Sequence, residues 1–191
     1  MRATDNRYRR EQTRFSLAVR LIEHEARTGT IRYLTGLQDE RIRKIYTTYF
    51  KYGSEPVRRR RGRSPTRIGP LVRTPLRALE SGVFVNLLIA GGLFSVDQPP
   101  GPSLKANVEL GHRLCDCFGS FELLVPHHSL SFEWGWNLLK SIRRGDELGV
   151  ARCQTCQVCY VFDLLTLPRT ACPTCVLCGE VPSVPFELMS A

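Results

Sequence analysis

Apolar residues recur at the spacing of an α-helix along most of the chain. The first stripe predicts an amphipathic helix and consists of Phe15, Ala18, Leu21, Ile22 and Ala26. Three later stripes predict buried helix faces: Leu79, Val83, Leu87 and Ala90; then Leu104, Val108, Cys115 and Phe118; then Phe132, Trp136, Leu139 and Ile142. We therefore expect five or six helices packed into one helical body that ends near Gly145.

The segment TIRYLTGLQDERIRKIYTTYF predicts two short helices around a tight turn at Thr35-Gly36. Asp39 is placed to cap the second helix. This spacing is typical of a helix-turn-helix, in which the exposed side chains facing a DNA groove would be Arg41, Arg43 and Lys44. A basic helical hairpin with no role in DNA binding gives a similar pattern, and both interpretations stay open here.

Charge divides the chain into two unequal parts. Residues 1–77 contain 20 Lys+Arg and 7 Asp+Glu, whereas residues 78–191 contain 7 and 11, so the first part carries +13 and the second −4. This asymmetry indicates a polyanion bound by the N-terminal part, with nucleic acid ahead of an anionic membrane.

Residues 51–77 form a basic stretch with many Gly and Pro residues, which predicts a loop or linker without helix. Its predicted phosphate contacts are Arg58, Arg59, Arg60, Arg61 and Arg63. Four such contacts would add about −3.6 to the slope of log affinity against log salt concentration. The alternative is a solvated stretch with no partner, which we rank lower because unpaired arginines repel one another.

Six of the eight cysteines lie between Cys153 and Cys178, in CQTCQVCYVFDLLTLPRTACPTCVLC. Two C-x₂-C pairs separated by a short segment are typical of a closed, structural Zn²⁺ site, so we expect one Zn²⁺ per chain. Two sets of four share this spacing: Cys153, Cys156, Cys172 and Cys175, or Cys156, Cys159, Cys175 and Cys178. Spacing alone does not choose; we favour the first set, because Tyr160 then packs beneath the first pair.

Other uses of these thiols are less favoured than zinc. CQTCQVC resembles the start of an iron–sulfur run, but Asp163 occupies the position of the fourth ligand. Disulfides are disfavoured if the protein is intracellular. Cys115 and Cys117, two positions apart on a predicted helix, point in nearly opposite directions and are expected to be buried thiols.

The chain has no predicted membrane span and no secretory leader, so we expect a cytoplasmic protein. No nucleophile with an arranged base, phosphate loop or carboxylate pair is visible, so an enzyme and a small-molecule substrate are not expected.

Several segments resemble the FlhC family, which contributes a subunit of the bacterial flagellar master regulator of transcription. These segments are LIEHEARTGTIRYLTGLQDERIRKIY, YGSEP, NLLIAGGL, WGWNLLKSIRRGDELGVARCQTC and TACPTC. The RRRRGR stretch, Cys159 and Cys178 depart from the family pattern. The resemblance implies zinc bound by Cys153, Cys156, Cys172 and Cys175.

The resemblance further implies a DNA-binding transcriptional activator that acts in a hetero-oligomer with an FlhD-like subunit. Its other partners would be double-stranded promoter DNA and RNA polymerase, at flagellar promoters. A zinc ribbon that binds structured RNA and an iron–sulfur or redox protein remain as alternatives.

The expected fold is mainly α, with a helix-turn-helix-like N-terminal hairpin and a small C-terminal zinc-binding α+β segment that holds four ligand cysteines. We expect four parts: N-terminal helices in 1–50, a basic linker in 51–77, a helical core in 78–150 and the zinc segment in 151–191.

Overall fold

The computed structural model describes residues 3–52, 57–60, 62, 64–65, 67–97, 101, 107–166 and 171–179. Its helices are α1 (Ala3–Glu23), α2 (Thr28–Thr35), α3 (Asp39–Tyr49), α4 (Pro70–Arg73), α5 (Pro75–Ala90), α6 (Val108–Leu124), α7 (Phe132–Arg144) and α8 (Pro173–Cys178). The strands β1 (Leu148–Arg152) and β2 (Cys159–Asp163) pair antiparallel, with Val150 opposite Val161. The predicted fold class, mainly α with a small C-terminal α+β segment, is confirmed.

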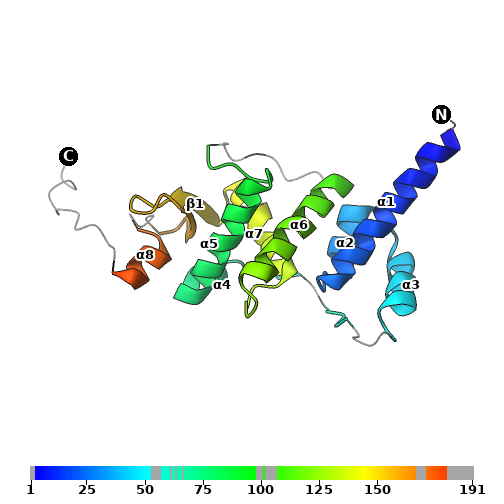
Figure 1. Cartoon of the computed structure of the whole chain (residues 1–191), viewed down its shortest axis with the longest axis horizontal. Coiled ribbons are helices and arrows are strands. Elements are labelled where there is room, and N and C mark those ends of the chain that lie inside the picture. The colour runs from blue at the N-terminus through cyan, green and yellow to red at the C-terminus, as the bar shows by residue number, and fades with distance from the viewer. Residues whose placement is uncertain are drawn as a thin grey trace.

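Figure 1 shows how these elements are arranged along the longest axis of the molecule. Helices α1, α2 and α3 lie at one end, α5, α6 and α7 form the middle, and the β-hairpin with α8 lies at the other end. The N-terminal half of α1 projects beyond its neighbours. The basic N-terminal helices and the cysteine-rich segment therefore lie at opposite ends of the molecule.

One apolar core runs from α1 to β2. It contains buried residues of α1 to α7 together with Leu148 of β1 and Val161 of β2. Four of its fully buried aromatic rings pack around one another in the middle of the body, with neighbouring ring centres 5.3 to 5.8 Å apart: Phe84, Phe118, Phe121 and Phe132. Because this core is continuous, the helices of residues 1–50 and 78–150 share it.

The predicted helical hairpin is present as α2, a short turn and α3. Gly36 ends α2 in the left-handed conformation with φ 70°, which glycine adopts without the steric penalty of a side chain. The predicted cap is wrong by one residue: Gln38 precedes the helix, and Asp39 is its first residue. Asp39 instead forms an ion pair with Arg32 Nη1 at 3.3 Å, across the turn.

The prediction that residues 51–77 contain no helix is wrong at the C-terminal end of that stretch. Pro70 begins α4 and Pro75 begins α5, where Thr74 accepts a hydrogen bond from the backbone N–H of Arg77. Proline at the first position of a helix sacrifices no hydrogen bond and has the φ angle that the helix needs. Both prolines therefore start a helix here. The predicted helix residue Leu104 lies outside the described residues, and α6 begins at Val108.

The predicted buried stripe of α5 is also wrong. The buried face of this helix contains Ala78, Ser81, Phe84, Val85 and Leu88, one position away from the predicted stripe. The predicted residues Leu79, Val83 and Leu87 are half-buried and line an apolar groove of about 350 Å³ between α5, the end of α6, β2 and the start of α8. Since α5 is apolar on nearly every side, the periodicity of its sequence does not identify the side that faces the core.

A buried carboxylate links three distant segments. Glu133 of α7 is 1% exposed; it accepts hydrogen bonds from the backbone N–H of Arg27 at 2.7 Å, from Thr30 Oγ1 at 3.1 Å and from Ser64 Oγ. A neighbouring amide, Asn137 Nδ2, donates to Ser64 Oγ at 3.0 Å. These hydrogen bonds attach part of the basic stretch and the start of α2 to α7.

Candidate metal centre

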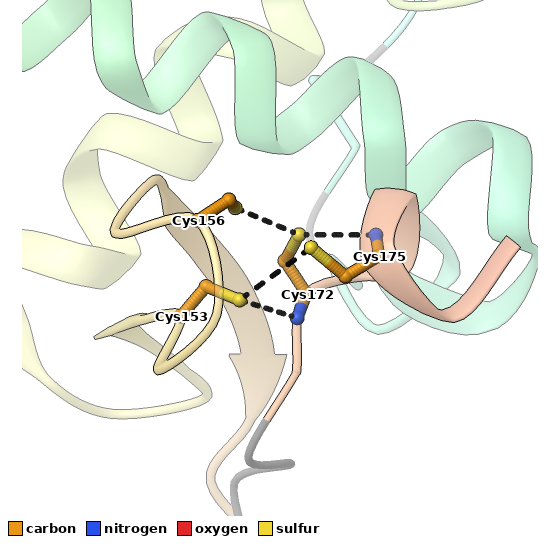
Figure 2. A group of neighbouring side chains, drawn as sticks. All are labelled: Cys153, Cys156, Cys172 and Cys175. Atoms are coloured by element: carbon orange, nitrogen blue, oxygen red, sulfur yellow. Dashed lines mark hydrogen bonds between the residues drawn. The ribbon is translucent and has the colours of Figure 1, made fainter. Parts of the chain in front are cut away.

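The first pair of cysteines lies in the turn of the β-hairpin. Cys153 follows β1 directly, and its backbone N–H donates to the carbonyl oxygen of Val158 at 2.9 Å. Gln157 has a positive φ of 62° and donates its N–H to the carbonyl oxygen of Cys153 at 3.0 Å. This tight turn brings the side chain of Cys156 back toward that of Cys153 (Figure 2).

The second pair lies at the start of α8. Cys172 is the N-cap of this helix, and its sulfur accepts a hydrogen bond from the backbone N–H of Cys175 at 3.4 Å. Pro173 occupies the first helical position. The backbone N–H of Cys172 donates to Cys153 Sγ at 3.2 Å, so the second pair is hydrogen-bonded to the first.

The four sulfur atoms converge on one point between the hairpin turn and α8 (Figure 2). Cys153 Sγ and Cys175 Sγ are 3.9 Å apart, Cys156 Sγ and Cys172 Sγ are 3.6 Å apart, and all four sulfurs lie within 4.8 Å of one another. Four sulfurs at about 2.3 Å from a tetrahedral ion would lie about 3.8 Å from one another. The arrangement therefore has the dimensions of a four-thiolate site for one metal ion.

Three of the four cysteines in this group are buried. Cys153, Cys172 and Cys175 are 0 to 3% exposed, whereas Cys156 is exposed. Around them, Tyr160 and Ala171 complete a small apolar cluster, separate from the main core. Tyr160 thus packs beneath the thiols, as the sequence predicted.

Hydrogen bonds prepare one of the thiols to ionise. Burial opposes ionisation of Cys153, but the backbone N–H groups of Cys156, Cys172 and Thr155 point at its sulfur and lower its pKa to about 6. Burial and the neighbouring sulfurs raise the pKa of Cys175 instead. Metal ligands must be thiolates, so a metal ion would displace the remaining protons, and its affinity would fall at low pH.

The structure distinguishes the two candidate sets of cysteines. The convergent set is Cys153, Cys156, Cys172 and Cys175, which is the favoured one. Cys159 is buried in β2 outside this group, and Cys178 is exposed at the end of α8. Gly179, which follows Cys178, ends α8 in the left-handed conformation with φ 72°.

Cys115 and Cys117 lie on α6 and take no part in this group. Both are buried, as predicted. Burial raises the pKa of Cys115 to about 12. Cys117 Sγ donates to the carbonyl oxygen of Leu87 at 3.4 Å, so this thiol packs against the end of α5.

One side chain of α5 is hydrogen-bonded to the hairpin that carries the first pair. Asn86 Nδ2 donates to the carbonyl oxygens of Gly82 and Cys159, each at 2.7 Å, and Asn86 Oδ1 accepts from the N–H of Cys159 at 3.3 Å. Sequence reasoning missed this role, although a lone Asn inside an apolar helical run is a signal for a buried polar contact.

The predicted DNA-facing residues of α3 are all exposed, on two flanks of the helix. Arg41 and Arg43 project about 160° apart, because successive helical residues are about 100° apart. Arg41 Nη1 forms an ion pair with Glu11 Oε2 of α1 at 2.6 Å. Within the described chain, Arg43 and Lys44 have no acidic partner within ion-pair distance.

Two arginines of the basic stretch, Arg59 and Arg60, contact the segment that joins α1 to α2 and the start of α2. Arg60 Nε forms an ion pair with Glu25 Oε2 at 2.7 Å, and Arg59 Nη2 donates to Thr28 Oγ1 at 3.3 Å. Arg58 is exposed. The other two predicted phosphate contacts lie outside the described residues: Arg61 and Arg63.

Comparison with protein-family models and with curated proteins gives no match to this sequence. Among the described helices, none combines the length and the apolar character needed to cross a bilayer.

Proposed function

We propose that the chain is a DNA-binding subunit of a transcriptional activator, without enzymatic activity, in which Cys153, Cys156, Cys172 and Cys175 bind one structural Zn²⁺. The observation that carries the metal-binding part of the proposal is the convergence of four cysteine sulfurs at distances that suit one tetrahedral ion. With four protein ligands, such a site has no open position for a reactant, so the ion would stabilise the fold.

Zinc is favoured over an iron–sulfur cluster by the size of the site. A cluster places several irons and bridging sulfides between the cysteine sulfurs, whereas these sulfurs lie within 4.8 Å of one another. Four thiolates in a tetrahedron are typical ligands of Zn²⁺.

Double-stranded DNA is the proposed ligand of the opposite end of the molecule. Support comes from the charge of +13 on residues 1–77 and from the exposed basic side chains of α3 and the following stretch: Arg41, Arg43, Lys44, Arg58, Arg59 and Arg60. Arg61 and Arg63 would add to the phosphate contacts. The sequence resemblance to the FlhC family adds a cytoplasmic location, an FlhD-like partner subunit, RNA polymerase and flagellar promoters to the proposal.

The metal is tested by elemental analysis of the full chain purified without added metal. We expect about one zinc per chain, and less than a tenth of that for Cys172→Ser. Cys178→Ser is the matched control, because it removes an exposed thiol outside the group. Stoichiometric iron with visible absorbance, or no metal, would refute the zinc assignment.

DNA binding is tested by fluorescence anisotropy with a labelled duplex over a range of salt concentrations, with duplex RNA of the same sequence as competitor. We expect steeply salt-dependent binding of DNA and weaker competition by RNA. Preference for the RNA would favour the RNA-binding alternative. Co-expression with an FlhD-like subunit, followed by sizing and footprinting on a flagellar promoter, tests the partner.

A further inference from the structure

One face of helix α1 is basic in the first half of the helix and apolar in the second half. In its second half this face is fully buried, through Leu17, Ala18 and Leu21. Seven residues earlier, and so on the same face of the helix, stand Arg10, Glu11 and Arg14.

The basic part of this face is open. Asn6, Arg7, Arg10, Glu11 and Arg14 line a hollow of about 490 Å³. Figure 1 shows this half of α1 projecting beyond the other helices, so the face continues the core-facing side of α1 past the body itself. We call these five residues the arm face.

Helix α3 borders the arm face. Phe15 of α1 contacts Tyr49 of α3 edge-on, with ring centres 5.8 Å apart, and Arg41 of α3 reaches Glu11 of α1. Glu11 also lies 3.6 Å from Arg14. The one carboxylate of the arm face is therefore shared by two guanidinium groups, with those of Arg7 and Arg10 beside it.

We propose that the arm face is a phosphate-binding site for the backbone of double-stranded DNA, formed by Arg7, Arg10 and Arg14 of α1 with Arg41 of α3, and that Glu11 limits its affinity. The proposal rests on the proposed function and adds a second contact surface to it. None of the three α1 arginines belongs to the DNA-facing set predicted from the sequence.

The spacing of the arginines suits a sugar–phosphate strand. Arg7 and Arg14 are two helical turns apart, about 10.5 Å along the axis. That distance corresponds to about three base-pair steps along the axis of the duplex, at about 3.4 Å of rise each. Planar guanidinium groups bind phosphate oxygens in pairs, so each arginine can serve one phosphate.

The pairing of charges distinguishes the roles of these residues. Arg14 and Arg41 share Glu11, whereas Arg7 and Arg10 have no carboxylate within ion-pair distance among the side chains that the structure describes, which begin at Asn6. Arg7 and Arg10 are also exposed. A phosphate strand would meet these two first and would compete with Glu11 for the other two.

The first test removes the charges of Arg7 and Arg10, as Arg7→Gln/Arg10→Gln in the full chain. In the anisotropy titration, two lost phosphate contacts would flatten the slope of log affinity against log salt concentration by about 1.8. The control is Arg144→Gln/Arg152→Gln, which removes the same charge from exposed positions in the C-terminal half. It should leave the slope within about 0.5 of wild type.

The second test is Glu11→Gln, which keeps the size of the side chain and removes the competing carboxylate. We expect duplex affinity to rise about two- to fivefold, the equilibrium factor that corresponds to one exposed ion pair. Glu40→Gln, at an exposed acid on α3, is the matched control and should change affinity less. Unchanged or weaker binding by Glu11→Gln would overturn the role of Glu11, and circular dichroism of each variant checks that α1 remains helical.

The outcomes separate this proposal from the proposed function. If wild type binds duplex DNA and Arg7→Gln/Arg10→Gln behaves like its control, the arm face is refuted and the proposed function stands. If wild type binds no duplex at any salt concentration, the proposed function itself fails. A third outcome is that the chain does not bind DNA but binds a polyglutamate peptide, and that this binding depends on Arg7 and Arg10. The arm face would then be a site for an acidic protein, which would overturn our assignment.

Discussion

The helical body and the cysteine segment are stabilised by different kinds of contact. The body has a continuous apolar core with four clustered aromatic rings, whereas the cluster around the thiols contains five buried residues, three of them cysteines. So small a cluster supplies little hydrophobic stabilisation, and the proposed metal would add to it by cross-linking the cysteines. The comparison predicts that loss of the proposed metal would destabilise the cysteine segment and leave the helical body folded.

The largest expected effect is the local unfolding of the cysteine segment when the proposed metal is lost. Cys172→Ser, or removal of metal by a chelator, should expose the amides of the hairpin turn, residues 153–158, and of residues 171–179 to hydrogen exchange, because structural zinc contributes on the order of 10–16 kcal/mol in small metal-folded peptides. The far-UV signal of α1 to α7 should remain. Cys178→Ser should change neither measurement. Loss of the whole helical signal with Cys172→Ser would show that the body depends on the metal as well.

The converse experiment destabilises the body. Phe84→Ala should lower the free energy of unfolding by about 3–5 kcal/mol, because it leaves a cavity among Phe118, Phe121 and the rings around them. Urea unfolding followed by circular dichroism measures the change. Leu123→Ala, at a side chain that is 84% exposed, should stay within about 0.5 kcal/mol of wild type. A loss below about 1 kcal/mol for Phe84→Ala would contradict the proposed division of stability.

A smaller effect concerns the buried carboxylate of the body. Glu133→Gln should cost about 1.5–3 kcal/mol, because hydrogen bonds to a charged acceptor are stronger than those to a neutral amide, and the amide also presents a donor to groups that themselves donate. Urea unfolding again gives the value. Glu109→Gln, at a side chain that is 78% exposed, is the control. Equal stability of the two variants would show that Glu133 does not stabilise the body.

The smallest expected effect is a pH dependence within the body. Burial lowers the pKa of His24 below its ordinary value of 6.5, although the charge of Glu122 opposes this shift and that of Arg20 adds to it. The unfolded chain then binds the proton more readily than the folded chain. Stability from this residue is therefore fully present above pH 6.5 and is lost as the pH falls through the lowered, folded-state pKa.

Urea unfolding between about pH 5 and 7.5 tests this assignment. His24→Gln should flatten the dependence of stability on pH, even if the variant is less stable throughout because its ring no longer stacks on Phe132. An unchanged pH dependence would assign it to other groups.

Prediction from sequence was most accurate where the determinants are local. The spacing of each C-x₂-C pair favours a tight turn, and the structure brings together the favoured set of four thiols. The turn at Gly36 was predictable for the same reason, because its conformation suits glycine. The helices with a clear apolar stripe, such as α7, were also placed correctly.

The predictions from sequence are wrong or incomplete where the structure of a segment depends on contacts that its own sequence pattern does not contain. The first half of α1 has no apolar stripe, so hydrophobic periodicity does not predict this part of the helix, although Arg, Glu and Gln favour helices. Pro70 and Pro75 predict breaks in the chain's helices, because residue type alone does not distinguish a helix start from a helix interruption. The burial of Glu133 depends on donors 69 to 106 residues away, which no local pattern contains.

Asn86 forms a polar joint between the helical body and the thiol-bearing hairpin. Its amide engages both backbone groups of Cys159 and so helps to set the direction in which the hairpin points from α5. The angle between the basic helices at one end of the molecule and the thiol-bearing hairpin at the other therefore depends in part on this side chain. A substitution of Asn86 would change the orientation of the hairpin relative to α5, while the helical body and the group of four thiols remain folded.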